Sequence, residues 1–385
     1  MTFRPTVLVA GLAASVLSAC AGPPPRAGDA HFRGILLPAA EILGDPAPGA
    51  GLSGLEASGF NAVVAAVGDE TTGEDLDLLA AAAREAGIAL HLWFHAGRNP
   101  RLAGARPEWI GGMGSHEDWR RLFPAAPRPG AGERIGVYPW VPIRYRAVFE
   151  DRVAAIEKLL RGRTEGIEAV FIHGLQAPPS ACGCGNDQCR WTVDYLMAGG
   201  PAKVPGSAPA AFIAALRERL PEVRWIPVWV TECEKVDQED GGTGYCGGVH
   251  CHDGLCWKES SAELDAVSRE LDTAGDGGPI ALLLAEGAFR RNLPRYGRTG
   301  GWIASAIRSL ATEPLVHGHR PIPPGRVIAV VEGTRGGAEE RSAVAQALIA
   351  GARGVIVSKM PLEEGWEPRL IPSAADPHDP TPAGR

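Results

Sequence analysis

The sequence lacks an excess of basic residues: 38 lysines and arginines face 45 aspartates and glutamates, for a formal net charge of −7. Nucleic-acid-binding proteins usually carry a basic patch, so no nucleic-acid partner is expected. Glycine (50) and proline (33) are abundant but follow no period, which excludes a collagen-like or low-complexity chain. No internal repeat or linker divides residues 31–371. A chain of 385 residues can form one large α/β barrel or two ordinary domains.

Several motifs are also missing. No glycine-rich phosphate-binding loop follows the first predicted strand, which disfavours a doubly wound open sheet. Neither Cys-x2-Cys nor Cys-x-x-Cys-His occurs. The sequence therefore supports neither a standard zinc finger nor covalently attached haem.

The first 19 residues have the features of a signal peptide. Arg4 supplies positive charge, and residues 7–17 form an apolar core about half as long as the roughly 20 residues of a spanning helix. This core ends in Leu17-Ser18-Ala19-Cys20, which resembles the lipobox of bacterial lipoproteins. The resemblance implies that Cys20 is lipidated and anchors the protein to a membrane through its acyl chains, palmitate among them. The alternative is an ordinary secretory signal with a chance cysteine.

The residues after Cys20 bear on location. Ala21 and Gly22 follow, whereas many lipoproteins retained in the inner membrane carry an aspartate there. The resemblance thus implies an envelope protein of the outer membrane, facing the periplasm or the exterior. Residues 20–30 are predicted to form an extended tether and residues 372–385 a disordered tail. The folded body is then residues 31–371.

Eight short apolar runs within that body are predicted to be strands. They show little alternation of polar and apolar residues, which is typical of parallel strands buried on both faces. The runs span residues 33–39, 61–67, 89–96, 168–175, 224–232, 279–287, 326–333 and 354–360.

Helical segments separate these runs. Several carry apolar residues at i, i+3 and i+4 and end in glycine, a C-cap signal. They span residues 74–87, 149–162, 208–220, 261–275, 302–311 and 338–351, with a less regular segment at 51–59. Eight alternating βα units predict a (β/α)₈ TIM barrel, whose active site lies on the loops that follow the strands. The long loops, at 97–146, 176–206, 233–259 and 288–300, all fall at that end.

The loops after the fourth and fifth strands hold all the cysteines except Cys20: Cys182, Cys184, Cys189, Cys233, Cys246, Cys251 and Cys256. Two interpretations compete. Outside the cytoplasm thiols oxidise, so these cysteines could form disulfides that tie long loops together, with one thiol left over. Alternatively, some of them bind zinc or copper together with His250 and His252, which flank Cys251. Zinc or copper is a cofactor only in the second interpretation.

Polar residues at the ends of apolar strands are costly to bury without a purpose. Such residues end the predicted strands at His95, His173, Glu232, Glu286, Glu332 and Lys359. Glycoside hydrolysis needs two carboxyl groups that flank the scissile bond. We therefore expect Glu332 to work with Glu286 or Glu232. For each residue the alternative is a structural hydrogen bond or ion pair at the barrel mouth.

Two further features fit a sugar ligand. The chain has ten tryptophans against five tyrosines, and Trp93 lies near the end of the third strand, where a flat ring can stack on a sugar. Arg290 and Arg291, after the sixth strand, could bind a carboxylate or phosphate on an acidic sugar. The alternatives are tryptophans that pack loops onto the barrel and a solvated basic loop.

One stretch resembles glycosidase-like bacterial TIM-barrel proteins. Residues 87–93 read Gly-Ile-x-x-His-x-Trp, residues 107–109 read Pro-Glu-Trp, and a long helical segment at 145–162 leads into the fourth strand. The resemblance implies a carbohydrate-binding, glycosidase-like barrel. In that family the fourth strand ends in acidic residues, whereas here His173 stands in their place. The cysteine-containing loops resemble segments of uncharacterised bacterial lipoproteins, which imply no activity.

The sequence as a whole predicts a lipid-anchored, envelope-facing barrel that binds carbohydrate. In one interpretation it is a glycoside hydrolase with Glu232, Glu286, Glu332 and His173 as catalytic residues. Substrate contacts would then come from Trp93, His95, Arg290, Arg291 and Lys359. In the other interpretation the barrel binds metal or glycan without catalysis.

Overall fold

The computed structural model describes the body of the chain with several gaps. It covers residues 31–97, 112–113, 133–136, 143–175, 202, 204–229, 235–237, 243–245, 257–273, 277–284, 301–312, 320–333, 337–360 and 369–372. The structural statements below concern these residues.

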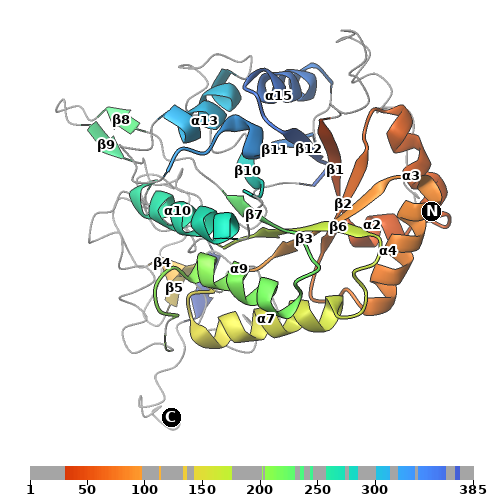
Figure 1. Ribbon diagram of the computed structural model, residues 1–385, viewed down its shortest axis with the longest axis horizontal. Coiled ribbons are helices and arrows are strands. Elements are labelled where there is room, and N and C mark those ends of the chain that lie inside the picture. The colour runs from red at the N-terminus through yellow and green to blue at the C-terminus, as the bar shows by residue number, and fades with distance from the viewer. Residues whose placement is uncertain are drawn as a thin grey trace, which may run out of the picture.

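Eight parallel strands close into a barrel (Figure 1), in the ring order β1-β12-β11-β10-β7-β6-β3-β2. They are β1 (Phe32–Pro38), β2 (Ala62–Val67), β3 (Ala89–His95), β6 (Ile167–His173), β7 (Trp225–Trp229), β10 (Ile280–Leu284), β11 (Val327–Glu332) and β12 (Gly354–Ser358). The first and last strands pair in parallel, from Phe32 opposite Gly354 to Leu36 opposite Ser358, and so close the ring. The predicted (β/α)₈ barrel is confirmed, and each predicted strand lies where the sequence placed it.

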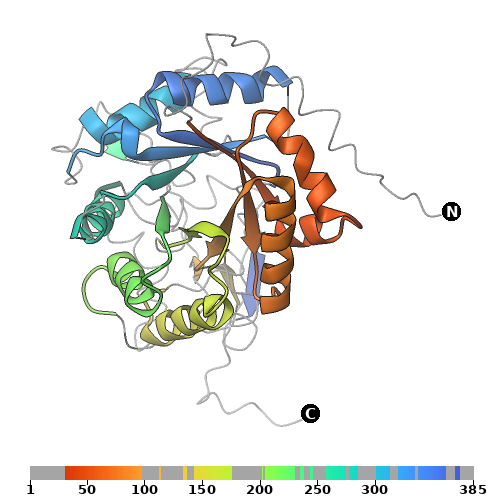
Figure 2. The same ribbon diagram turned by 45° about the vertical axis from the view of Figure 1, so that its right-hand side comes forward.

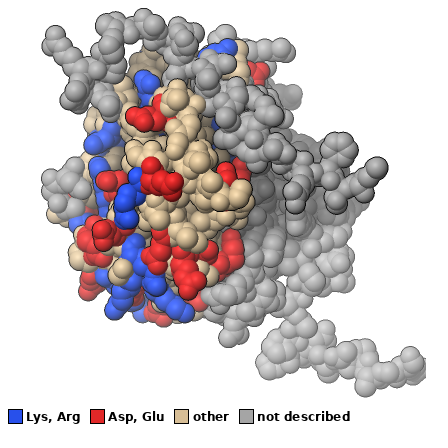
Figure 3. All heavy atoms as spheres, turned by 90° about the vertical axis from the view of Figure 1, so that its right-hand side faces the viewer, with Lys and Arg blue, Asp and Glu red and all other residues tan. Residues whose placement is uncertain are grey.

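Helices form an outer layer around the strands (Figure 2). They are α2 (Ala39–Leu43), α3 (Pro48–Ala57), α4 (Gly73–Ala86), α7 (Arg146–Leu160), α9 (Ala208–Arg219), α10 (Trp257–Thr273), α13 (Gly301–Thr312) and α15 (Gly337–Ile349), with a short 3₁₀ turn η4 at Pro324–Arg326. No helix among the described residues is both long and apolar enough to cross a membrane. Acidic and basic side chains are interspersed on the side of the molecule at the right of Figure 1, as Figure 3 shows.

Helix α4 illustrates how local sequence sets an element's ends. The Thr72 hydroxyl accepts a hydrogen bond from Asp75 N, and the Asp75 carboxylate accepts one from Thr72 N, so the two residues form a capping box. At the other end Gly87 adopts φ 68°, a left-handed conformation that glycine reaches without strain. These signals explain why the sequence predicted this helix to within one residue at each end.

The core has two parts because side chains alternate across each strand. One set fills the barrel interior, including Leu36, Trp93, Phe171, Val330 and Ile356. The other set packs against the helices. Residues at odd positions of β3 and β6, such as Trp93 and Phe171, point inward, so His95 and His173 share that face at the carboxyl ends of the strands.

Two small sheets lie outside the barrel. One contains β4 (Gly112–Met113), β5 (Glu133–Gly136) and β13 (Arg369–Pro372), and the other β8 (Lys235–Asp237) and β9 (Thr243–Tyr245). The sequence predicted none of these strands. Through β13, a segment beyond the last barrel strand pairs with β5 in the insertion that follows β3.

Candidate functional site

Four ring side chains lie in contact along the inward faces of β3 and β6. His95 lies opposite His173 in the strand register, and their ring centroids are 4.3 Å apart. The Trp93 ring lies 5.5 Å from that of His173 and stacks on Phe171 at 5.9 Å. These contacts form a continuous wall of rings, which we call the aromatic wall (Trp93, His95, Phe171 and His173).

His173 is the most perturbed residue of the aromatic wall. Its side chain is only 8% exposed, and the desolvation that comes with burial lowers its pKa to about 3. The imidazole is therefore neutral at pH 7, so it can exchange hydrogen bonds but carries no positive charge.

The backbone beside His173 leaves no room for a larger residue. Gly174 has φ 74°, and a Cβ built on it would lie 2.6 Å from His95 Nδ1 and 3.0 Å from Gly97 N. Ala96 N donates a 2.6 Å hydrogen bond to His173 O, which ties the ends of β3 and β6 together. Glycine at this position thus allows the close approach of the two histidines.

The opposite side of the mouth carries charge. Glu332 ends β11, pairs in register with Ser358 of β12, and is partly buried. Lys359 follows β12, and its ammonium group donates hydrogen bonds to Glu340 Oε2 at 2.8 Å and Gly333 O at 3.0 Å. Glu340 comes from α15 and is only 2% exposed, so a buried carboxylate fixes the lysine in place. We call these residues the charged wall (Glu332, Gly333, Glu340 and Lys359).

The strand order places the two walls across the barrel from each other. Going round the ring, β2 and β1 separate β3 from β12, and β7 and β10 separate β6 from β11. The aromatic wall and the charged wall therefore face each other across the carboxyl end, where barrels of this class bind their ligands.

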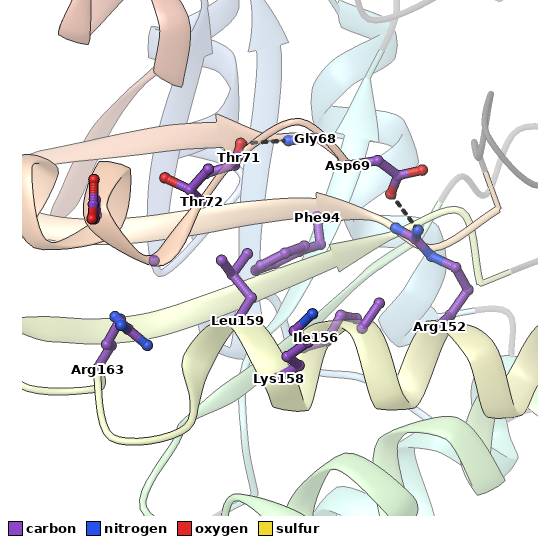
Figure 4. A pocket seen from close by; sticks show the side chains of 13 residues that line it. Gly68, Asp69, Thr71, Thr72, Phe94, Arg152, Ile156, Lys158, Leu159 and Arg163 are labelled. Atoms are coloured by element: carbon purple, nitrogen blue, oxygen red, sulfur yellow. Dashed lines mark hydrogen bonds and ion pairs between the residues drawn. The ribbon is translucent and has the colours of Figure 1, made fainter.

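A hollow lies on the outer wall of the barrel. It has a volume of about 800 Å³ and lies between the β2–α4 connection and α7 (Figure 4). Figure 4 shows Phe94, Ile156 and Leu159 along its apolar side and the 2.5 Å ion pair between Arg152 and Asp69 at one end. Arg163 and Lys158 add positive charge. None of the predicted site residues that the structure describes lines this hollow.

The structure brings together five of the predicted site residues: Trp93, His95, His173, Glu332 and Lys359. The others lie outside the described residues. These are Cys20, Cys182, Cys184, Cys189, Glu232, Cys233, Cys246, His250, Cys251, His252, Cys256, Glu286, Arg290 and Arg291. Among the residues that are described, no group of three or more histidines, cysteines and acids could hold a metal ion.

Sequence reasoning missed Glu340, which holds Lys359. It lies on the helix after β11, among other polar residues of the first turn, and nothing in its local pattern marks it as buried. Glu340 lies in the first turn of α15, whereas Lys359 follows the next strand, β12. Their contact depends on how α15 packs, which the local sequence does not show.

Comparison with known proteins adds likenesses of fold alone. No protein-family model and no curated protein matches the chain. The catalytic domain of β-amylase from Paenibacillus polymyxa has 8% identity and a TM-score of 0.47, over 86% of this chain and 92% of that one. An α-amylase from Geobacillus thermoleovorans, complexed with acarbose, has 11% identity and a TM-score of 0.39, over 87% and 71%. A β-galactosidase from the psychrophilic Marinomonas ef1 has 9% identity and a TM-score of 0.43, over 85% and 53%.

These identities and TM-scores are too low to carry an argument about activity. The class of protein is defined by the closed ring of strands itself: the chain is a (β/α)₈-barrel protein.

Proposed function

We propose that the carboxyl end of the barrel binds carbohydrate. The observation that supports this most is the partly exposed His95 ring of the aromatic wall, which faces the charged wall across the barrel. A sugar presents apolar C–H faces and a rim of hydroxyl groups, so it needs ring surfaces on one side and hydrogen-bonding groups on the other.

Each wall has a distinct part in this proposal. Lys359 uses two of its three ammonium protons on Gly333 and Glu340, which leaves one to donate to a sugar hydroxyl. Trp93 is only 4% exposed and supports the wall from below, whereas His95 is partly exposed and is the ring that meets the ligand. Neutral His173 positions His95 and does not supply charge.

We further propose that Glu332 is one of a pair of carboxyl groups that hydrolyse a glycosidic bond. Its partner would be Glu286 or Glu232, which follow β10 and β7, the next strands round the ring from β11. Such a pair works as acid and nucleophile at a separation of about 5 Å, or as acid and base at roughly 6.5–9.5 Å.

Binding and turnover are tested on one panel of glycans. We expect Lys359→Met to weaken binding about tenfold, the size of one charge-assisted hydrogen bond. Lys158→Met is the matched control, because Lys158 is an exposed lysine of α7 on the outer wall. Equal loss in both variants, or no glycan bound by the wild type, would contradict the proposal.

The hydrolytic step is tested by Glu332→Gln, Glu286→Gln and Glu232→Gln. We expect Glu332→Gln and one of the others to lower turnover by about 10²–10⁴-fold. If all three variants retain turnover, the carboxylate assignment is wrong. Glycan binding without turnover in the wild type would instead favour a binding protein.

We also propose that Cys20 is lipidated and anchors the barrel in the cell envelope, in the outer membrane. The support is the signal-like sequence up to Leu17-Ser18-Ala19-Cys20. Growth with a labelled fatty acid tests this: the wild type should incorporate label, and Cys20→Ser should not. Label in the Cys20→Ser protein would refute the anchor.

A further inference from the structure

The amino-terminal end of the barrel has a cavity of its own. It has a volume of about 200 Å³ and lies at the end of the barrel opposite His95, His173 and the charged wall. Phe32, His91 and Phe171 line its inner part, and Arg224 and Arg353 line it from the residues just before β7 and β12. A space of this size holds several water molecules, or one small ion with part of its hydration shell.

Neither of the two arginines has an acidic partner among the residues that the structure describes. Eight other described arginines form an ion pair with a carboxylate: Arg152, Arg161, Arg163, Arg217, Arg219, Arg269, Arg320 and Arg326. Within the described part of the chain, neither Arg224 nor Arg353 makes an ion pair or a side-chain hydrogen bond. The cavity therefore carries two positive charges that nothing described in the protein neutralises.

The backbone holds these arginines in defined positions. Arg224 O accepts a 2.8 Å hydrogen bond from Val170 N, and Arg353 N donates a 2.8 Å hydrogen bond to Val327 O. Both residues are thus anchored to neighbouring strands of the barrel. Only the side chains need to adjust when an anion enters, which limits the entropy lost on binding.

His91 provides a third polar group inside the cavity. Its side chain is 8% exposed, and its Nδ1 is buried without a hydrogen-bond partner among the described residues. The imidazole packs edge-on against Phe32 at 5.1 Å and Phe171 at 5.9 Å. Burial, together with the positive charge of Arg224, lowers its pKa to about 4, so it stays neutral and can donate one N–H at pH 7.

We propose that this cavity is a binding site for a phosphate-class oxyanion, held by Arg224 and Arg353 with His91 at its inner end. One guanidinium satisfies a single carboxylate through two parallel hydrogen bonds. Two guanidinium groups on separate strands fit an anion with more than two oxygens and a double charge. The volume admits free phosphate or the phosphate group of a small ester whose remainder projects into solvent.

Titration calorimetry with inorganic phosphate at constant ionic strength tests the site. We expect the wild type to bind with a dissociation constant on the order of 1 mM or tighter. Arg224→Met and Arg353→Met should each weaken binding by about tenfold or more. Arg84→Met is the matched control, since Arg84 is an exposed arginine in the last turn of α4 and does not line the cavity. This control should bind phosphate like the wild type.

Two further arms identify the ligand and its location. His91→Phe keeps the packing against Phe32 and Phe171 but removes the polar atoms, and should weaken binding by about threefold to tenfold. Acetate should bind more weakly than phosphate. A phosphate monoester that binds much more tightly than inorganic phosphate would indicate that the ligand is a phosphorylated metabolite.

The proposal is overturned if the wild type shows no saturable phosphate binding, or if Arg84→Met weakens it as much as the cavity variants do. Acetate binding as tightly as phosphate would also overturn it. Glycan binding at the other end should be unchanged in the arginine variants, so this test and that of the carbohydrate site fail independently.

Discussion

The two ends of the barrel differ in whether their positively charged side chains have an acidic partner. At the carboxyl end, Lys359 is fixed by Glu340, a carboxylate that is 2% exposed. At the amino end, Arg224 and Arg353 line a cavity without any described acidic partner. An internal partner fixes the position of a charged side chain and offsets its attraction for external ions, whereas an unpaired side chain remains available to bind them. The carboxyl end is therefore suited to positioning a neutral ligand, and the amino end to binding an anion.

The histidines show what the two ends share. His173 and His91 both have lowered pKa values, to about 3 and about 4, and desolvation is the largest cause for each. The barrel interior thus keeps imidazoles neutral at either end. The difference between the ends comes from the residues beyond the strands, not from the interior itself.

The largest expected effect comes from breaking the pair at the carboxyl end. Lys359→Met leaves the buried Glu340 carboxylate without its cation and should lower the free energy of unfolding by about 3 kcal/mol. Urea denaturation measures this loss. The double variant Lys359→Met/Glu340→Leu should recover most of the stability, because no buried charge then remains. A double variant as unstable as the single one would contradict the assigned pairing.

The pH dependence of stability should be alike at both ends. The folded state holds His173 and His91 neutral. The free energy of unfolding is therefore highest above the unfolded pKa of 6.5 and falls as the pH drops toward the folded pKa values of about 3 and 4. Between pH 7 and pH 5 each histidine should lower the free energy of unfolding by about 2 kcal/mol.

Stability curves of the wild type and of His173→Phe and His91→Phe test this expectation. Each substitution should flatten the decline below pH 6.5, and the double variant should flatten it further. If a variant keeps the wild-type slope of stability against pH, the imidazole it lacks is charged or accessible in the folded wild type.

A smaller effect is expected where the backbone shapes the aromatic wall. Gly174→Ala places a Cβ on a residue with a left-handed backbone and brings that Cβ against His95. The substitution should lower the free energy of unfolding by about 1–2 kcal/mol and reduce glycan binding. Thermal denaturation measures the first effect. Gly54→Ala in α3 is the control: its added Cβ meets nothing within 4 Å, so it should be neutral or stabilise by up to about 1 kcal/mol.

The smallest effect is expected at the amino end. Arg224→Met and Arg353→Met remove no described ion pair, so in phosphate-free buffer each should change stability by no more than about 0.5 kcal/mol. Added phosphate should raise the melting temperature of the wild type but not of either variant. A large loss of stability in phosphate-free buffer would show that these arginines are structural.

The strands were predictable because burial on both faces leaves long apolar runs, as in Ile280–Leu284 and Val327–Glu332. Helix α4 was predictable because its caps, Thr72 and Gly87, act within a few residues. The β13–β5 pairing was not, since it joins segments far apart in sequence whose local patterns are weak. Local rules therefore fix the barrel elements, and long-range pairing adds the rest.

The candidate site divides in the same way. His95, His173 and Lys359 were predicted from their place at strand ends, where polarity interrupts an apolar run. The contact between Lys359 and Glu340 depends on how α15 packs and has no local signal. Arg224 and Arg353 were missed because they precede their strands and line one cavity only once the ring has closed.

The pairing of Phe32–Leu36 with Gly354–Ser358 has a consequence for biosynthesis. While the polypeptide is emerging, β1 and β11 each expose an unsatisfied row of backbone amides and carbonyls, because the strand between them is the last of the eight to be made. Such edges can recruit neighbouring chains, and contacts between the two extremes of a sequence form slowly. Until β12 can pair with both of them, these two edges are therefore the places where another copy of the chain can add by strand pairing.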